Sequence, residues 1–441
     1  MNNFTTYLIN MTSYGSLYIK NKLVRSTVED LDWFTNLIFH TTDAKVYEQE
    51  YRKDHPNPFL HTEEKHVLSS RAGILLERLN VLGFSEEEMK SNFEAMRQYR
   101  IKELSFLIDY HDTIETSNHI KERKFWKKYD LNDFLESIHK LVHEPDLKIK
   151  KSSYERIYSN TFNYIIDKDY DLLEALPFSN DLFSLRAFLT VVAPDTLVVF
   201  DYTDLYDAEI FTDEDVINPK EPHERIIVLT EGTSDIAILK PALQLLYPHL
   251  YEFYSFFDFE SFNSQGGSGN LVNMIKSFAG AGISNKIIAL FDNDTAAREA
   301  QATLEELSLP HHIKILNYPY ISFAENYPTL GPTGLNFMNI NGLACSIELY
   351  LGEDVLKEIN GELLPILWKG YSPKMQAYQG EIMSKREIQK RYLQKLAACK
   401  ASDQVSNHQN WNGIISIFEM MFDGFNSEKN NYQSVLKRES S

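Results

Sequence analysis

Two apolar segments of this chain end in carboxylates, and this repeated pattern constrains the fold more than any other feature. Residues 226–229 (IIVL) run through Thr230 to Glu231 and Gly232, and residues 287–291 (IIALF) run directly to Asp292 and then Asp294. Short apolar, β-branched runs bounded by turn residues are typical of strands covered on both faces, as in a parallel sheet. The pattern predicts an α/β fold in which a central parallel sheet is flanked by helices.

The acidic residues are expected to meet at one edge of that sheet. Ligands of open α/β sheets bind beyond the carboxyl ends of the strands. If the two strands are neighbours, Glu231, Asp292 and Asp294 converge there, and Asp235 approaches from the next helix. Like charges at ~4 Å repel by roughly 4 kcal/mol at an effective dielectric near 20, so such a cluster shares protons, recruits Lys or Arg, or binds a cation. Oxygen ligands without Cys or His favour Mg²⁺ or Mn²⁺.

These motifs carry a family resemblance. Glu231-Gly232-x-x-Asp235 followed by Asp292-x-Asp294, each after a hydrophobic strand, resembles the Toprim domain. That fold is shared by topoisomerases, bacterial primases, small RNases and OLD-type nucleases. The resemblance implies that Glu231 is a general acid or base and a metal ligand. It also implies that Asp235, Asp292 and Asp294 bind divalent metal.

Two later segments extend the resemblance. Residues 341–351 resemble the OLD-type segment that supplies another metal-site carboxylate, which makes Glu348 a candidate ligand. Residues 378–389 resemble the carboxyl end of HEPN/Toprim-type chains, where in OLD-like nucleases a lysine completes the site. Lys385 is the corresponding catalytic candidate, because a lysine can neutralise charge that develops on a leaving oxygen. A surface glutamate and a surface lysine on a basic helix remain the alternatives.

The amino-terminal half has its own resemblance. The string Arg78–Ser85, together with Ser13-Tyr14-Gly15, is similar to the HEPN/Toprim amino-terminal domain of prokaryotic defence proteins. HEPN ribonucleases are marked by an Arg and a His separated by four to six residues. Here Arg52 and His55 are too close together, and Arg100 and His111 are too far apart. A helical scaffold or sensor is therefore expected here, rather than a second nuclease.

Local patterns predict further elements. A hairpin is expected over residues 13–24, a loop over 44–60, and a helix over 63–82 that stops at Gly83. The basic aromatic run 121–128 suits either base stacking or a solvated helix face with Phe125 and Trp126 in the core. The glycine-rich turn at 266–270 suits either phosphate binding or a flexible turn.

The chain is expected to divide into five parts. Residues 1–200 form the amino-terminal domain, and the acidic, proline-containing segment 201–222 forms a linker. Residues 223–365 form the Toprim-like catalytic domain, 366–426 a basic helical extension, and 427–441 a flexible tail.

Composition limits the partners and the compartment. The net charge of −19 gives no overall basic footprint, so nucleic acid must be bound by local basic patches. Two cysteines, Cys345 and Cys399, provide neither a disulfide framework nor zinc spacing, which favours a reducing cytoplasm. No basic leader precedes an apolar core, and no apolar run approaches the ~20 residues of a membrane helix, so neither a signal peptide nor membrane association is expected.

Together the two resemblances imply a Mg²⁺- or Mn²⁺-dependent nuclease that cleaves phosphodiester bonds in DNA or RNA, in the role of an anti-phage effector. The alternative is a non-catalytic metal- or nucleotide-binding regulatory subunit of a defence complex. A partner protein or phage trigger and a homo-oligomer are compatible with either. A topoisomerase would need a tyrosine-bearing cleavage domain, and a primase zinc-binding modules; neither is recognisable.

Overall fold

The computed structural model describes residues 14–27, 37–52, 60–110, 114–144, 158–167, 171–217, 224–257, 266–305, 307–402 and 409–426. The chain divides into two compact units, formed mainly by residues 1–223 (unit 1) and residues 224–425 (unit 2). The expected flexible tail at 427–441 lies outside the described residues.

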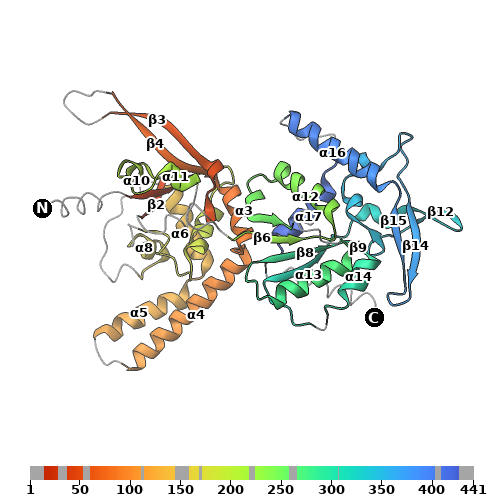
Figure 1. The fold of residues 1–441 in the computed structure, drawn as a ribbon. Coiled ribbons are helices and arrows are strands. Elements are labelled where there is room, and N and C mark those ends of the chain that lie inside the picture. Colours follow the sequence, from red (N-terminus) through yellow and green to blue (C-terminus); the bar gives the residue numbers. More distant parts are fainter. Residues whose placement is uncertain are drawn as a thin grey trace. The chain divides into compact units, whose positions relative to one another are not determined.

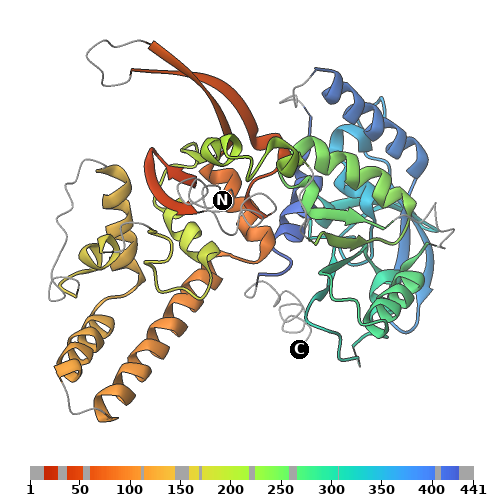
Figure 2. The same ribbon diagram turned by 60° about the vertical axis from the view of Figure 1, so that its left-hand side comes forward.

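Unit 1 is built on a five-stranded antiparallel sheet with the strand order β2-β1-β5-β4-β3. Figures 1 and 2 show β3 and β4 as a long hairpin that extends from this sheet. The strands are β1 (Gly15–Ile19), β2 (Lys22–Thr27), β3 (Ala44–Arg52), β4 (Leu60–Arg71) and β5 (Leu197–Asp201). The hairpin predicted near residue 20 is confirmed by β1 and β2.

Helices complete unit 1 and pack on the sheet through one hydrophobic core. They are α3 (Ala72–Leu82), α4 (Glu86–Tyr110), α5 (Ile114–Lys128), α6 (Leu131–His143), α8 (Thr161–Ile166), α9 (Asp181–Thr190), α10 (Thr203–Asp207) and α11 (Asp213–Ile217), with a 3₁₀ turn, η2 (Thr41–Asp43). Gly83 ends α3 in the left-handed conformation, with φ of 94°, as predicted. Helices α10 and α11 lie in the segment that was expected to be a linker.

Two local predictions for unit 1 are wrong. Residues 44–52, expected in a loop, form β3, and residues 63–71, expected in a helix, belong to β4. β4 pairs with β3 on one side and with β5 on the other. The pairing with the distant strand β5 overrides the helix-like spacing of the apolar residues, because strand formation depends on cross-strand neighbours.

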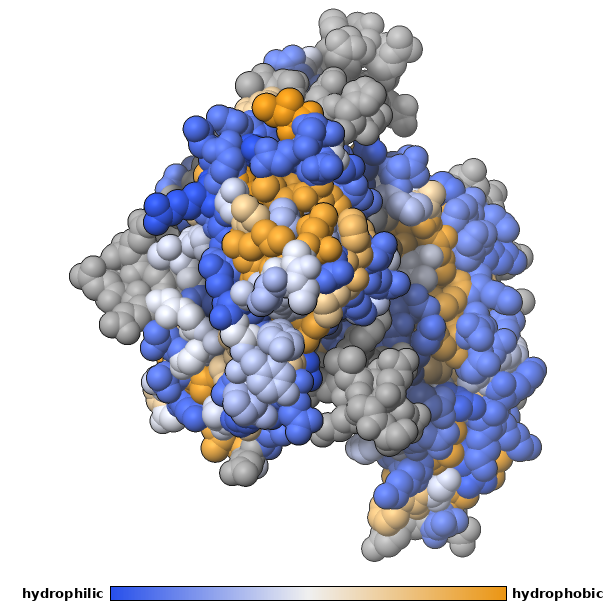
Figure 3. Space-filling model, turned by 90° about the vertical axis from the view of Figure 1, so that its right-hand side faces the viewer, coloured by the Kyte–Doolittle hydropathy of each residue, from blue (hydrophilic) through white to orange (hydrophobic). Residues whose placement is uncertain are grey.

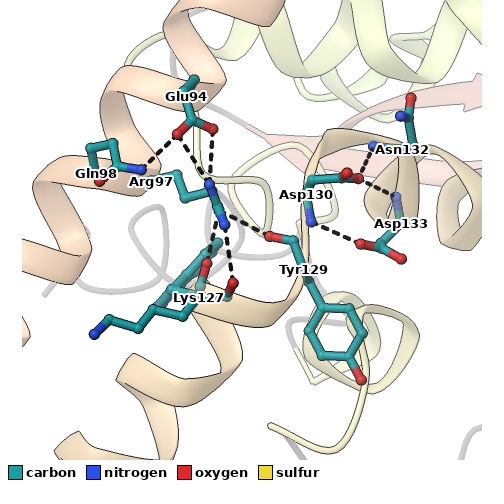
Figure 4. Close-up of polar contacts among 9 residues, drawn as sticks. Glu94, Arg97, Gln98, Lys127, Tyr129, Asp130, Asn132 and Asp133 are labelled. Atoms are coloured by element: carbon teal, nitrogen blue, oxygen red, sulfur yellow. Dashed lines mark hydrogen bonds and ion pairs between the residues drawn. The ribbon is translucent and has the colours of Figure 1, made fainter.

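The junction between α4, α5 and α6 is held by polar contacts (Figure 4). The Arg97 side chain donates to the backbone carbonyls of Trp126, at 2.8 Å, and Tyr129, at 3.0 Å. It also pairs with Glu94. Asp130 then caps α6 by accepting from the backbone N–H groups of its first turn. These contacts fix the end of α5. Phe125 and Trp126 are buried there, so of the two alternatives for residues 121–128, the one that places these rings in the core is confirmed.

Unit 2 contains a four-stranded parallel sheet with the order β10-β8-β6-β7. Its strands are β6 (Ile226–Leu229), β7 (Tyr254–Phe256), β8 (Ile287–Phe291) and β10 (Ile313–Asn317). All five residues of β8 are buried, as expected for a central strand covered on both faces. The predicted mixed α/β architecture with a parallel sheet is confirmed.

Helices cover both faces of this sheet (Figure 1). Helices α13 (Ser268–Gly280) and α14 (Thr295–Gln301) share a hydrophobic core with β8. Helices α12 (Thr233–Leu246) and α17 (Asn412–Phe422) contact each other, and the end of α17 meets Ile288 on the other face. Pro241 lies inside α12, which continues through it. The remaining helices are α15 (Glu353–Leu356) and α16 (Lys385–Ser402), with 3₁₀ turns η3 (Tyr251–Phe253), η4 (Ser322–Asn326) and η5 (Ile347–Tyr350).

A second sheet in unit 2 has the order β12-β11-β14-β15. It contains β11 (Tyr327–Gly331), β12 (Gly334–Met338), β14 (Ile366–Ser372) and β15 (Ala377–Ile382), while β9 (Asn293–Asp294) pairs with β13 (Ala344–Cys345). The prediction that 366–426 is a helical extension is therefore wrong for residues 366–382, which form a hairpin. The predicted basic helix is α16.

No helix in the described ranges is both long and apolar enough to span a membrane.

Candidate metal centre

The two central strands bring two of the predicted carboxylates together. β6 and β8 are parallel neighbours, with Leu229 opposite Ala289. Glu231 and Asp292 follow the carboxyl ends of these strands, and the backbone N–H of Asp292 donates to Glu231 Oε1 at 3.0 Å. The glycine-rich turn lies against the same point, since a Cβ on Gly266 would be 2.9 Å from the carbonyl oxygen of Glu231. Close packing therefore explains the glycine at this position.

Asp235 reaches the same edge from the first turn of α12. It is buried, and its Oδ2 accepts from the backbone N–H of Gly232 at 3.0 Å. Its Oδ1 accepts from the Tyr318 hydroxyl at 3.1 Å. Tyr318 directly follows β10, so residues at the ends of two parallel strands, β6 and β10, hold this carboxylate.

Glu348 and Lys385 come from elements outside the parallel sheet. Glu348 lies in η5 and is only 2% exposed. It accepts from Ser346 Oγ at 2.6 Å and from Gln389 Nε2 at 2.8 Å. Lys385, the first residue of α16, places Nζ 3.7 Å from Glu348 Oε2 and 3.8 Å from Glu381 Oε1. Glu348 is thus not a surface glutamate.

These side chains line one cavity of about 130 Å³, which is room for several water molecules. The predicted site residues in its wall are Glu231, Asp235, Asp292, Glu348 and Lys385.

Asp294, the sixth predicted residue, does not line this cavity. Its Oδ1 accepts from the backbone N–H of Ala297 at 2.8 Å and caps α14. Its Oδ2 accepts from Gln379 Nε2 at 2.7 Å. Both carboxylate oxygens are therefore engaged, and Asp294 influences the site through its charge.

The cavity concentrates negative charge that burial makes costly. Burial raises the pKa of Glu231 to about 7, although the backbone N–H of Asp292 opposes the rise. Burial and the nearby Glu348 raise the pKa of Asp235 to about 6. Burial and the Glu231 charge raise the pKa of Asp292 well above its usual value. Burial alone would lower the pKa of Lys385, but the surrounding carboxylates raise it instead.

The donor set fits a hard divalent cation. Asp292 Oδ1 is buried and has no hydrogen-bond partner among the described residues. Within the described ranges, however, no three His, Cys, Asp or Glu side chains are grouped closely enough to hold a metal ion. The carboxylates surround the cavity without closing on one point. This arrangement suits a cation that keeps part of its water shell, as Mg²⁺ does.

The residues that hold the carboxylates in place were not predicted from the sequence. Tyr318 binds Asp235, Gln379 binds Asp294, and Gln389 binds Glu348. Only two signals were available in the sequence. Tyr318 follows a third apolar strand, and Gln389 lies one helical turn after Lys385.

Comparison with known proteins supports the family resemblance expected for the amino-terminal half of the chain. Residues 11–224, just under half of the chain, match the family model described as HEPN/Toprim N-terminal domain 1. The match supports the HEPN/Toprim family and a nuclease-like or defence-related role. Neither the curated proteins nor the solved structures contain a match to this chain.

Proposed function

We propose that this protein is a divalent-metal-dependent nuclease that cleaves phosphodiester bonds in DNA or RNA, through an OLD-like Toprim site. The observation that carries the proposal is the common cavity at the carboxyl ends of β6 and β8. Four carboxylates and one lysine from separate parts of unit 2 line it. Burying this much charge is costly without a ligand, and a cation with a phosphate would offset it.

Each side chain has a role that follows from its position. Asp292, with its unpartnered Oδ1, and Asp235 would hold Mg²⁺ or Mn²⁺, directly or through water, and Glu348 would complete the site. A bound divalent cation supplies an activated water and neutralises charge on the leaving oxygen. Glu231 combines a place in the cavity wall with a pKa of about 7, which suits a group that ligates metal and accepts a proton near neutral pH. Lys385 would neutralise charge on the phosphate.

The test is cleavage of plasmid DNA and of single- and double-stranded DNA and RNA, with Mg²⁺ or Mn²⁺ added. The variants are Glu231→Gln and Asp292→Asn, and the matched control is Glu358→Gln, an exposed glutamate away from the cavity. Loss of a proton acceptor or ligand should reduce the rate by at least ~100-fold, while the control stays at wild-type rate. Equal activity in the wild type and all three variants would refute the proposal. Calorimetric Mg²⁺ binding without cleavage of any substrate would favour the non-catalytic regulatory subunit.

We further propose that the nuclease acts as an anti-phage effector in the cytoplasm. The match of residues 11–224 supports this role. Because an active nuclease harms its host, a partner protein, a phage trigger or assembly into a homo-oligomer would restrain it. Sequencing nucleic acids from infected cells that express wild type or Asp292→Asn tests this. New breaks that appear in wild-type cells only, and only after infection, are expected.

A further inference from the structure

The β14–β15 hairpin carries a cluster of three aromatic rings, of which Trp368 is half-buried and the two tyrosines are exposed. Trp368 and Tyr378 have ring centroids 6.1 Å apart, and Tyr371 and Tyr378 have centroids 5.1 Å apart. Tyr371 is 52% exposed and Tyr378 is 56% exposed. Figure 3 views unit 2 from the side that carries β12, β14 and β15; the exposed hydrophobic side chains of this sheet include Leu335 and Phe337 of β12. We call Trp368, Tyr371 and Tyr378 the hairpin rings.

The hairpin rings are attached to the candidate metal centre. The backbone carbonyl of Tyr378 accepts from Thr295 Oγ1 at 2.8 Å. The next residue, Gln379, donates to Asp294 and accepts from the backbone N–H of Ala296 at 2.8 Å. The same strand that presents Tyr378 to solvent therefore also fixes the Asp292–Asp294 segment.

The surrounding segment has the opposite charge to the rest of the chain. Residues 366–402 contain eight Lys or Arg and two Glu, a net charge of +6 in a chain whose net charge is −19. Lys374, in the hairpin turn, and Arg386, on α16, are exposed. Exposed rings beside cations bind both components of a nucleic acid, because bases stack on the rings and phosphates pair with the cations.

We propose that the hairpin rings stack unpaired bases and thereby select single-stranded nucleic acid, or a single-stranded stretch, as the substrate of the metal centre. This inference rests on the proposed nuclease function and deepens it. Only unpaired bases expose the faces that a ring can stack on, since paired bases are covered by their neighbours. Exposed cations of this segment, Lys374 and Arg386 among them, hold the backbone, and the attachment through Gln379 places the bound strand beside the cavity.

The test measures binding separately from cleavage. The full chain with Asp292→Asn, in EDTA, is titrated with matched single-stranded and double-stranded oligonucleotides that carry a fluorescent base analogue, whose emission falls on stacking. Tyr371→Ala and Tyr378→Ala are compared with Tyr371→Phe and Tyr378→Phe, which keep the ring. Phe337→Ala is the matched control. It removes a 60%-exposed ring from β12, on the sheet face opposite Trp368 by strand alternation and register.

We expect tighter binding of the single strand, with quenched emission. Each Tyr→Ala change should weaken this binding about 5- to 150-fold, in line with ~1–3 kcal/mol per stacked base. The Phe variants and Phe337→Ala should stay within about twofold, and thermal melts of all variants should match, because both tyrosines are exposed. Equal affinity for both substrates, or Ala variants that bind as wild type does, would overturn the inference and leave these rings to a protein partner. If binding depends on the rings but the wild-type protein cleaves no substrate, only the proposed nuclease function is refuted.

Discussion

At the scale of single residues, the raised pKa of Glu231 should make the stability of the protein depend on pH. Its pKa is about 7 in the folded protein, against about 4.3 for an unperturbed glutamate. Between these values the folded state binds more protons than the unfolded state, so this group lowers stability as pH rises through the window. Without a cation, the advantage in Tm of Glu231→Gln over wild type should therefore grow from pH 5 to pH 7.5.

Thermal unfolding in EDTA across that pH range measures this effect. Glu358→Gln is the control and should show a constant difference from wild type. A Glu231→Gln advantage that shrinks as pH rises would contradict the raised pKa. Because a cation binds the deprotonated carboxylates, the stabilisation by Mg²⁺ should increase over the same interval.

Asp294 has two roles that substitutions can separate: it caps α14, and it adds negative charge near the cavity. Asparagine caps helices about as well as aspartate, but its amide nitrogen cannot accept the hydrogen bond from Gln379 Nε2. Asp294→Asn should therefore cost about 1 kcal/mol, and Asp294→Ala, which also loses the cap, about 2 kcal/mol. Because Asp294 lies outside the cavity wall, Asp294→Asn should weaken Mg²⁺ binding several-fold without abolishing it. Denaturant titration and calorimetry measure the two effects. Complete loss of binding, as expected for Asp292→Asn, would make Asp294 a direct ligand.

At the scale of elements, Arg97 joins α4 to the end of α5. Replacing it with Met keeps the side-chain length but removes the donors to the carbonyls of Trp126, Lys127 and Tyr129. We expect Arg97→Met to lower the free energy of unfolding by about 1–3 kcal/mol, the cost of losing hydrogen bonds to a charged group.

Urea titration followed by circular dichroism checks this value. Gln98→Met is the matched control, because Gln98 is exposed and donates to the exposed Glu94 (Figure 4). It should change stability by less than about 0.5 kcal/mol. Equal losses in the two variants would mean that the carbonyls at the end of α5 do not depend on Arg97.

At the scale of the whole molecule, charge is distributed unevenly. The chain is acidic overall, and residues 366–402 are basic. Arg386 and Lys390 are exposed, and each is replaced singly by Gln. Each variant should weaken nucleic-acid binding and reduce the slope of log K against log salt by about 0.7–0.9 per lost phosphate contact.

Binding at several salt concentrations measures that slope. Lys276→Gln, on an exposed position of α13, changes the net charge equally outside the basic segment and should leave the slope unchanged. Similar effects of all three substitutions would indicate that net charge, rather than this segment, governs binding.

The sequence by itself determined the parallel strands with acidic residues at their ends. A strand buried on both faces must be a continuous apolar run, and its carboxyl end must be polar where it leaves the core, so both features are local. The helix stop at Gly83 was predictable for the same reason, because one residue supplies the left-handed backbone.

Only the tertiary structure decided which side chains meet at the cavity and which ones hold them. Gln379 reaches Asp294 across 85 residues, and Gln389 reaches Glu348 across 41. β4 and the β14–β15 hairpin were likewise misjudged. β4 pairs with β5 and β14 pairs with β11, and both partners are distant in the chain. Local periodicity reports which side of an element is buried, but a hydrogen bond between distant segments forms only once the chain has folded.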